Sequence, residues 1–238
     1  MICAKHICKA GRFLLIAAAF GAAGCQSPSY HTPATFPDEP KNRRIVLLPV
    51  DVELSLLHAG GGQEVNAEWT RLARKHLSND LATRFEKIKA TLVERKATAE
   101  DFGKDDKENQ LLKLHERVGA AILVYQQKGA WQLPTKAGTF DWSLGSETRY
   151  LREKYGADYA LFIFLRDSYS SSGRVAAMII AAPFGGIRGG MQLGFSSLVN
   201  IHTGEFVWFN HLARTSGDLR TPEGARETLD TLLESFPK

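Results

Sequence analysis

Cysteine is scarce in this chain of 238 residues, and its three copies all lie within the first 25 positions. The rest of the sequence therefore has no disulfide framework, no cysteine-ligated zinc site and no cysteine nucleophile. An excess of one charge is also lacking. Three of the 30 lysines and arginines precede residue 13, and the others nearly balance the 26 acidic residues. This balance excludes the basic surface that nucleic-acid binding requires.

Sequence motifs of the common enzyme classes are missing. There is no Gly-x-Ser-x-Gly elbow, no His-Glu-x-x-His pair, no phosphate-binding loop and no dinucleotide fingerprint. The histidines after residue 25 never recur at the i, i+4 spacing of metal ligands, and we expect His76 and His115 to border packed helix faces. We therefore expect no enzyme activity, no catalytic residues, no metal and no cofactor. A catalytic set assembled from distant positions, as in a cell-wall hydrolase, stays open as an alternative.

The amino terminus has the pattern of a targeting segment. Three cations and no acids precede a short apolar run at 13–20, and small residues lead into Cys25. A charged start, an apolar centre and a small-residue exit are typical of a secretory signal peptide, which we predict over residues 1–24. The uncharged stretch of about 18 Å as a helix is too short to span a hydrocarbon core of about 30 Å.

The exit of this segment, Ala22-Ala23-Gly24-Cys25, resembles the lipobox of bacterial lipoproteins. The resemblance implies that Cys25 becomes the lipidated first residue of the mature chain and anchors it to a membrane. Ala22 stands where leucine is usual, which leaves cleavage without lipidation as the alternative. No aspartate follows Cys25, and in a two-membrane bacterium this resemblance implies the periplasmic side of the outer membrane.

A tether and one domain are expected after the anchor. Residues 25–42 hold four of the nine prolines among Ser, Thr and His, a composition typical of an extended linker. Residues 43–238 then predict one α/β domain, a single mixed sheet with helices packed on it. Expected strands cover 44–50, 91–93, 159–165, 195–201 and 205–213. Expected helices cover 65–88, 111–125, 146–155 and the segment after Thr221, with a charged loop over 96–109.

Three short segments carry a resemblance to a group of periplasmic lipoproteins. They are 44–50 after the tether, Gly156-Ala157-Asp158 before a strand, and Asn200-Ile201-His202-Thr203-Gly204-Glu205, the hairpin that leads to Trp208. The group includes the curli-secretion pore lipoprotein, the lipoprotein activators of penicillin-binding proteins and the amino-terminal domain of the Tol-system propeller protein. The resemblance implies an accessory or scaffold protein that binds another envelope protein. A self-assembling secretion-pore subunit stays open as an alternative.

The stretch 175–197 is the most unusual part of the domain, because thirteen uncharged residues separate Arg174 from Arg188. One interpretation places it in the core, as strands or a short helix joined by a glycine-rich turn. The other makes it an exposed apolar loop that docks on a partner or a membrane interface, with Phe184 and Ile187 at its tip and Arg188 as a charged flank.

Overall fold

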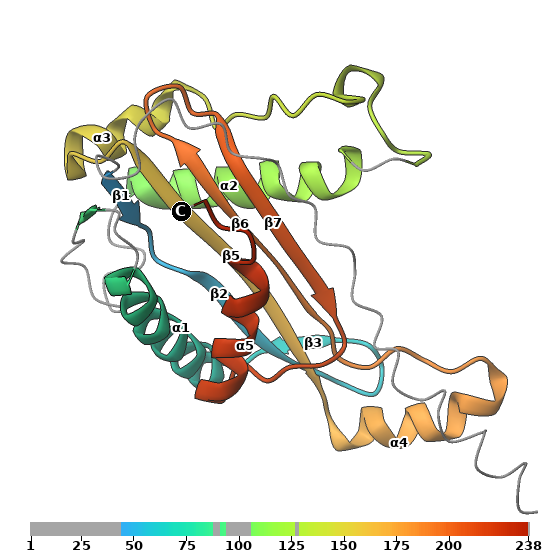
Figure 1. The fold of residues 1–238 in the computed structure, drawn as a ribbon. Coiled ribbons are helices and arrows are strands. Elements are labelled where there is room, and N and C mark those ends of the chain that lie inside the picture. Colours follow the sequence, from blue (N-terminus) through green and yellow to red (C-terminus); the bar gives the residue numbers. More distant parts are fainter. Residues whose placement is uncertain (1–43, 88–90, 94–105, 127–128, 238) are drawn as a thin grey trace, which may run out of the picture.

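A mixed β-sheet forms the centre of the domain in the computed structural model, which describes residues 44–87, 91–93, 106–126 and 129–237 (Figure 1). The expected signal peptide, Cys25 and the tether lie outside these residues. The seven strands are β1 (Arg44–Leu47), β2 (Asp51–Leu57), β3 (Gln63–Val65), β4 (Thr91–Val93), β5 (Tyr159–Ser170), β6 (Gln192–Asn200) and β7 (Phe206–Arg214). The expected α/β fold with one mixed sheet is confirmed.

Strand β5 organises the sheet because it pairs along both of its edges. β1 and β2 run parallel to it on one edge, one after the other, and β6 runs antiparallel on the other edge and pairs in turn with β7. Pro49 separates β1 from β2, since proline has no backbone N–H to donate to a ladder. The expectation of one strand over 44–50 is therefore wrong: β1 ends at Leu47, and a second strand comes after it.

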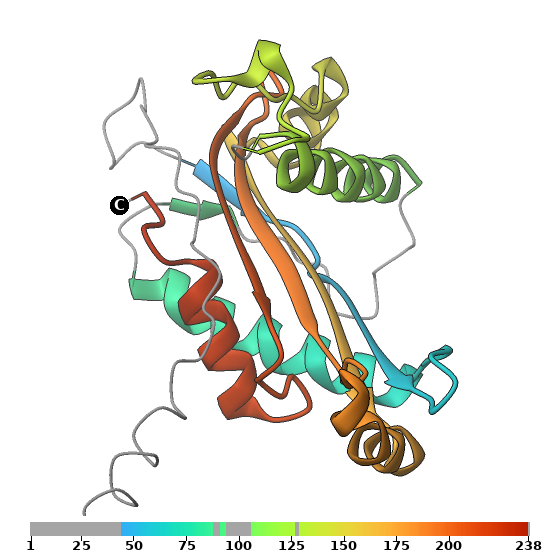
Figure 2. The same ribbon diagram turned by 90° about the vertical axis from the view of Figure 1, so that its right-hand side faces the viewer.

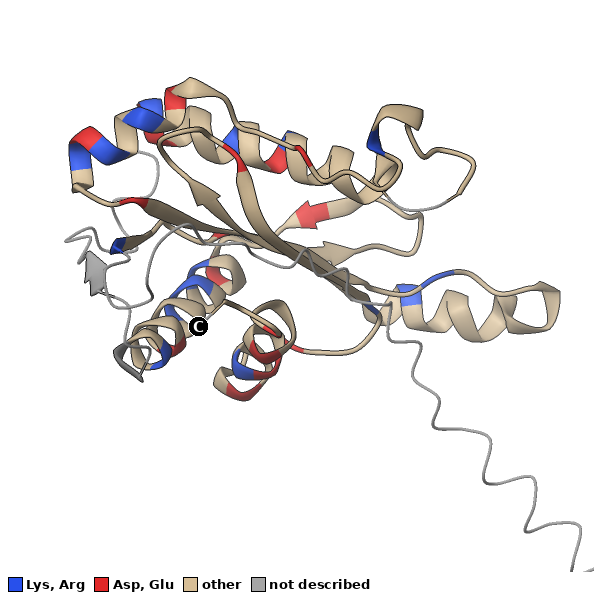
Figure 3. Ribbon diagram, turned by 45° about the horizontal axis from the view of Figure 1, so that its top comes forward, with Lys and Arg blue, Asp and Glu red and all other residues tan. Residues whose placement is uncertain are grey.

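Helices cover both faces of the sheet (Figures 2 and 3). Helices α1 (Ala67–Lys87) and α5 (Pro222–Leu232) pack on one face, and α2 (Asp106–Tyr125) and α3 (Arg149–Tyr155) pack on the other. Helix α4 (Ser172–Ala181) lies apart from both layers (Figure 1). Three short 3₁₀ turns complete the described helical segments, at Pro134–Lys136, Ser146–Thr148 and Ala182–Phe184. No helix in the described part of the chain is long and apolar enough to cross a membrane.

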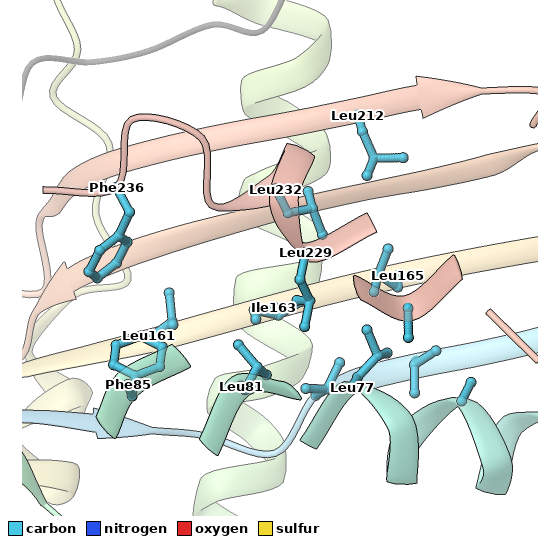
Figure 4. Close-up of a cluster of buried hydrophobic side chains, with 14 of the residues drawn as sticks. Leu77, Leu81, Phe85, Leu161, Ile163, Leu165, Leu212, Leu229, Leu232 and Phe236 are labelled. Atoms are coloured by element: carbon cyan, nitrogen blue, oxygen red, sulfur yellow. The ribbon is translucent and has the colours of Figure 1, made fainter. Parts of the chain in front are cut away.

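The alternation of side chains along β5 divides the core into two halves. Leu161, Ile163 and Leu165 point to the α1–α5 side, and Ala160, Phe162 and Phe164 point to the α2 side, as the two-residue period of a strand requires. Figure 4 shows the first half, where β5 meets leucines from two helices. Besides the three β5 residues of this side, it labels Leu77, Leu81, Phe85, Leu212, Leu229, Leu232 and Phe236.

Expected helix ends are mostly confirmed. Gly156 ends α3 in the left-handed conformation at φ 64°, and Thr221 caps α5 by accepting a hydrogen bond from the Gly224 amide, with Pro222 in the first turn. Ser146 is not a side-chain cap, because the turn that begins there has no capping hydrogen bond. Helix α2 begins at Asp106, so the part of the expected loop from 106 to 109 is helical.

Gly119 lets α2 approach the sheet closely. A Cβ atom at this position would lie 2.1 Å from the Phe195 ring, far inside contact distance. We expect Gly119→Ala to lower the free energy of unfolding by about 1–3 kcal/mol, the usual cost of overpacking a core, measured by urea denaturation. Gly173→Ala in α4 is the matched control, since its Cβ would meet the nearest atom at an ordinary 3.6 Å. A Gly119→Ala protein as stable as the parent would contradict this packing.

Candidate functional site

Helix α4 connects β5 to β6 and replaces the tight turn that usually joins two antiparallel strands. Ser171 caps its start by accepting a hydrogen bond from the Arg174 amide. The 3₁₀ turn at Ala182–Phe184 follows, and Gly185 and Gly186 reverse the chain at φ 98° and 71°. The local sequence therefore produces a short helix that projects from the sheet, as Figure 3 also shows.

The side chains of this projection are exposed although they are apolar. None of the residues of α4 or of the turn after it is buried, and Ile179, Ile180 and Phe184 are 71%, 72% and 88% exposed. Three further exposed apolar side chains, at 37–46%, extend this patch along the same segment. We call the whole patch the α4 surface; it consists of Val175, Ile179, Ile180, Phe184, Ile187 and Met191.

The interpretation of 175–191 as core is therefore wrong. The two residues expected at a docking tip, Phe184 and Ile187, are 88% and 37% exposed, and Arg188, the expected charged flank, is exposed as well. The stretch from 192 onward does enter the sheet as β6, with Phe195 and Leu198 buried. The structure thus divides the expected segment at Gln192. The residues before Gln192 belong to the surface, and the strand that begins there belongs to the core.

Arginine side chains hold the α4 surface in place. The Arg174 guanidinium donates two hydrogen bonds to the Arg188 carbonyl oxygen, at 3.1 and 2.7 Å, and one to the Ala59 carbonyl oxygen at 3.2 Å. These bonds tie both ends of the projection together and to the loop after β2. No acidic residue occurs between Asp167 and Glu205, and Arg174 and Arg188 are the charged residues of the segment that forms the apolar surface (Figure 3).

A cavity of about 520 Å³ lies beside the α4 surface. Its walls come from the end of β5, from α4, from the segment that enters β6 and from the loop after β7. The apolar lining side chains are Val175, Met178 and Met191, and the polar ones include Asp167, Tyr169 and Gln192. Because Val175 and Met191 belong to both features, the cavity opens next to the exposed patch. We call it the Asp167 pocket.

Asp167 is the buried carboxylate of this pocket, only 4% exposed. Its Oδ2 accepts hydrogen bonds from the Tyr169 hydroxyl at 2.5 Å and from the Gln192 side-chain amide at 3.0 Å. Burial raises the pKa of Asp167, while these two donors and the Leu219 backbone act in the opposite direction. Burial, helped by the neighbouring Asp167 carboxylate, also raises the pKa of the Tyr169 hydroxyl, which therefore stays a donor.

A second exposed apolar patch lies in the segment after α2. Trp131 is 74% exposed and Leu133 is 40% exposed. Figures 1 and 2 place this segment and α4 at opposite ends of the long strands, so the two patches are separate. The sequence marked this region as irregular and aromatic, without any functional signal. Groups of three or more potential metal ligands do not occur among the described residues.

Comparison with known proteins gives structural likeness alone. No protein-family model matches the chain, and no curated protein matches it. A PelC dodecamer from Paraburkholderia phytofirmans shares 13% identity at a TM-score of 0.35, covering 86% of this chain and 96% of that one. The LpoB C-terminal domain from Salmonella enterica shares 16% identity at a TM-score of 0.30, covering 74% of this chain and 84% of that one.

Lipoprotein GNA1162 from Neisseria meningitidis shares 11% identity at a TM-score of 0.29, covering 72% of this chain and 81% of that one. The likeness to these three solved structures, one of which is described as a lipoprotein, singles out no member of the group. TM-scores below 0.5 carry no argument about partner or assembly.

Proposed function

We propose that this chain is a lipid-anchored envelope protein without catalytic chemistry, held to the outer membrane at Cys25 on its periplasmic side, that binds another envelope protein through the α4 surface. The observation that carries the proposal is the exposure of Ile179 and Ile180 on α4 and of Phe184 in the turn after it, two elements with no buried residue. Contiguous apolar patches on soluble domains usually mark contact sites. Burial of each such side chain in a complex is worth about 1.5–3 kcal/mol.

The spacing of the exposed side chains suits a protein groove. Val175 and Ile179 are four residues apart and so share a face of α4. Ile180 and Phe184 have the same spacing across the junction between α4 and the 3₁₀ turn that follows it. Anchors at this spacing are the pattern by which a helix docks in the groove of a partner. Helices that lie in a membrane interface usually carry several cations on their polar face. Arg174 is the one cation within α4, and its guanidinium is occupied by backbone carbonyls.

Crosslinking in intact cells tests the proposal. A photoreactive residue at Ala176, which is exposed on α4, should capture an envelope protein. Ile179→Ser with Phe184→Ser should reduce this capture at least tenfold and leave the melting temperature within a degree or two, because exposed substitutions usually change stability by less than about 0.5 kcal/mol. Trp131→Ser is the matched control, an equally exposed aromatic at the other end of the sheet.

Each other outcome has a defined meaning. Capture that survives the double substitution, or a loss of stability of several kcal/mol, contradicts docking through α4. Capture of lipid alone would mean that the α4 surface contacts the membrane and not a protein partner. Capture of a second copy of this chain supports the self-assembling alternative, which size measurement in detergent then checks.

A further inference from the structure

The Asp167 pocket contains a carboxylate whose charge has no direct partner. Within the described parts of the chain, no lysine, arginine or histidine nitrogen forms an ion pair with Asp167, and both side-chain donors that reach it are neutral and end on Oδ2. A buried carboxylate without a cation is costly, and the raised pKa of Asp167 reflects this. A cationic group in the pocket would remove that cost.

Arg214 and Arg220 do not supply this cation, because each has its own acidic partner. The Arg174 guanidinium is occupied by backbone carbonyl oxygens. Arg214 pairs with Glu227 at 2.6 Å and also donates to the Gln192 side chain. Arg220 forms two hydrogen bonds to the Asp218 carboxylate, at 2.8 and 2.7 Å, and its guanidinium stacks on the Tyr169 ring at 3.9 Å. Neither forms an ion pair with Asp167, although the Asp167 charge contributes to raising the pKa of the nearby Arg220 guanidinium.

The rest of the lining suits the stem of a long basic side chain. Val175, Met178 and Met191 form an apolar wall, against which lysine and arginine methylenes pack while their charged heads reach a polar group. The volume of about 520 Å³ lies within the usual range of about 300–1,000 Å³ for ligand sites. A single carboxylate is too few ligands for a divalent metal ion, which favours an organic cation.

We propose that the Asp167 pocket receives a lysine or arginine side chain of the protein that docks on the α4 surface, and that its ammonium or guanidinium pairs with Asp167. The inference rests on the proposed function for the source of the cation, because the pocket shares Val175 and Met191 with the α4 surface. It specifies the partner segment: large apolar side chains for α4, with a basic residue beside them.

Two small probes test the pocket without the partner. n-Butylguanidinium carries the charge and stem of arginine, and n-butylurea is its neutral analogue of the same shape. The ¹⁵N-labelled full chain in non-ionic detergent is titrated with each, and the backbone amides of Gly190 and Gly217, which line the pocket, are followed by NMR. We expect saturable shifts with n-butylguanidinium at a concentration at least tenfold below any shift with n-butylurea. Equal effects of the two probes would overturn the pocket's preference for a cation.

Substitutions then show whether the binding of n-butylguanidinium depends on the Asp167 carboxylate. Asp167→Asn should weaken the binding of n-butylguanidinium at least tenfold, whereas Glu223→Gln, which removes an exposed carboxylate of α5 outside the pocket, should not. Unchanged binding in Asp167→Asn overturns the inference, and the comparison of the two probes on the parent chain decides even if that variant does not fold.

The crosslinking yield separates the two proposals. Asp167→Asn should reduce capture from Ala176 at least tenfold. Probe binding that depends on Asp167, together with unchanged capture, would mean that the pocket takes a small amine and not a partner's side chain. Failure of the α4 proposal has a different signature, namely capture that survives Ile179→Ser with Phe184→Ser.

Discussion

Lowering the pH from 7 to 4.5 is expected to reduce the free energy of unfolding by about 2–3 kcal/mol through His115 alone. His115 is 1% exposed, stacked on Phe162 with ring centroids 4.8 Å apart and hydrogen-bonded to the Ser197 hydroxyl at 2.6 Å. Burial in this aromatic cluster lowers the pKa of His115 to about 3. At pH 4.5 the unfolded chain, with a histidine pKa near 6.5, therefore binds a proton at this position, whereas the folded chain does not.

The sign of the effect is set by this difference. The stabilisation by neutral His115 is complete above the unfolded pKa of about 6.5, falls by about 1.4 kcal/mol per pH unit below it, and is lost as the pH reaches the folded pKa. Urea denaturation at pH 7 and 4.5 measures it. His115→Phe keeps the ring but cannot titrate, so its stability should fall by about 2–3 kcal/mol less over the same interval. Equal acid sensitivity of parent and variant would mean that His115 is not buried neutral.

The sequence predicted those elements whose signals are local. The apolar run at 159–165, the turn at His202-Thr203-Gly204 and the Thr221-Pro222 cap each specify one element, and β5, the β6–β7 hairpin and α5 all exist. Strand β7 is covered on both faces, since Trp208 belongs to the core half on the α1–α5 side and Phe209 to the other. Such features depend on neighbours a few residues away.

Elements whose polar residues are buried were missed or shortened. Strand β2 includes Asp51, only 6% exposed, which pairs with Arg166 from β5 at 2.9 Å. Helix α2 includes Glu108, 2% exposed, which accepts hydrogen bonds from the Lys154 ammonium and the Tyr155 hydroxyl of α3. In the sequence alone, both carboxylates predict a position on the surface, because the partners that make their burial possible are distant in the chain. The acidic first turn of α2 was the one local signal, since acids favour helix starts.

The candidate site shows the opposite difficulty. An apolar stretch indicates core by default, and the sequence could mark 175–191 as unusual without deciding on which side of the surface it lies. Exposure depends on long-range contacts, namely the β5–β6 register that leaves α4 outside the sheet and the Arg174 bonds to Arg188 and Ala59. The Asp167 pocket needs four segments brought together, and no spacing in the sequence predicts it.

Replacing Cys25 with alanine is expected to release the chain from the membrane, because the signal segment ends there and no later thiol exists. Each methylene of an acyl chain contributes about 0.8 kcal/mol of membrane binding, so loss of the lipids should move nearly all of the protein out of the membrane fraction or leave an uncleaved precursor. Fractionation and electrophoretic mobility measure both.

Cys8→Ala is the matched control for this experiment, since position 8 lies inside the segment that we expect to be removed, and it should change neither localisation nor mobility. Unchanged membrane association and mobility of Cys25→Ala would disprove the anchor. Combining Cys25→Ala with Ile179→Ser and Phe184→Ser distinguishes the remaining cases. A single variant that stays on the membrane while the triple variant leaves it would show that the α4 surface contacts the membrane or a protein embedded there. Release by Cys25→Ala alone leaves α4 free for a periplasmic partner, as proposed.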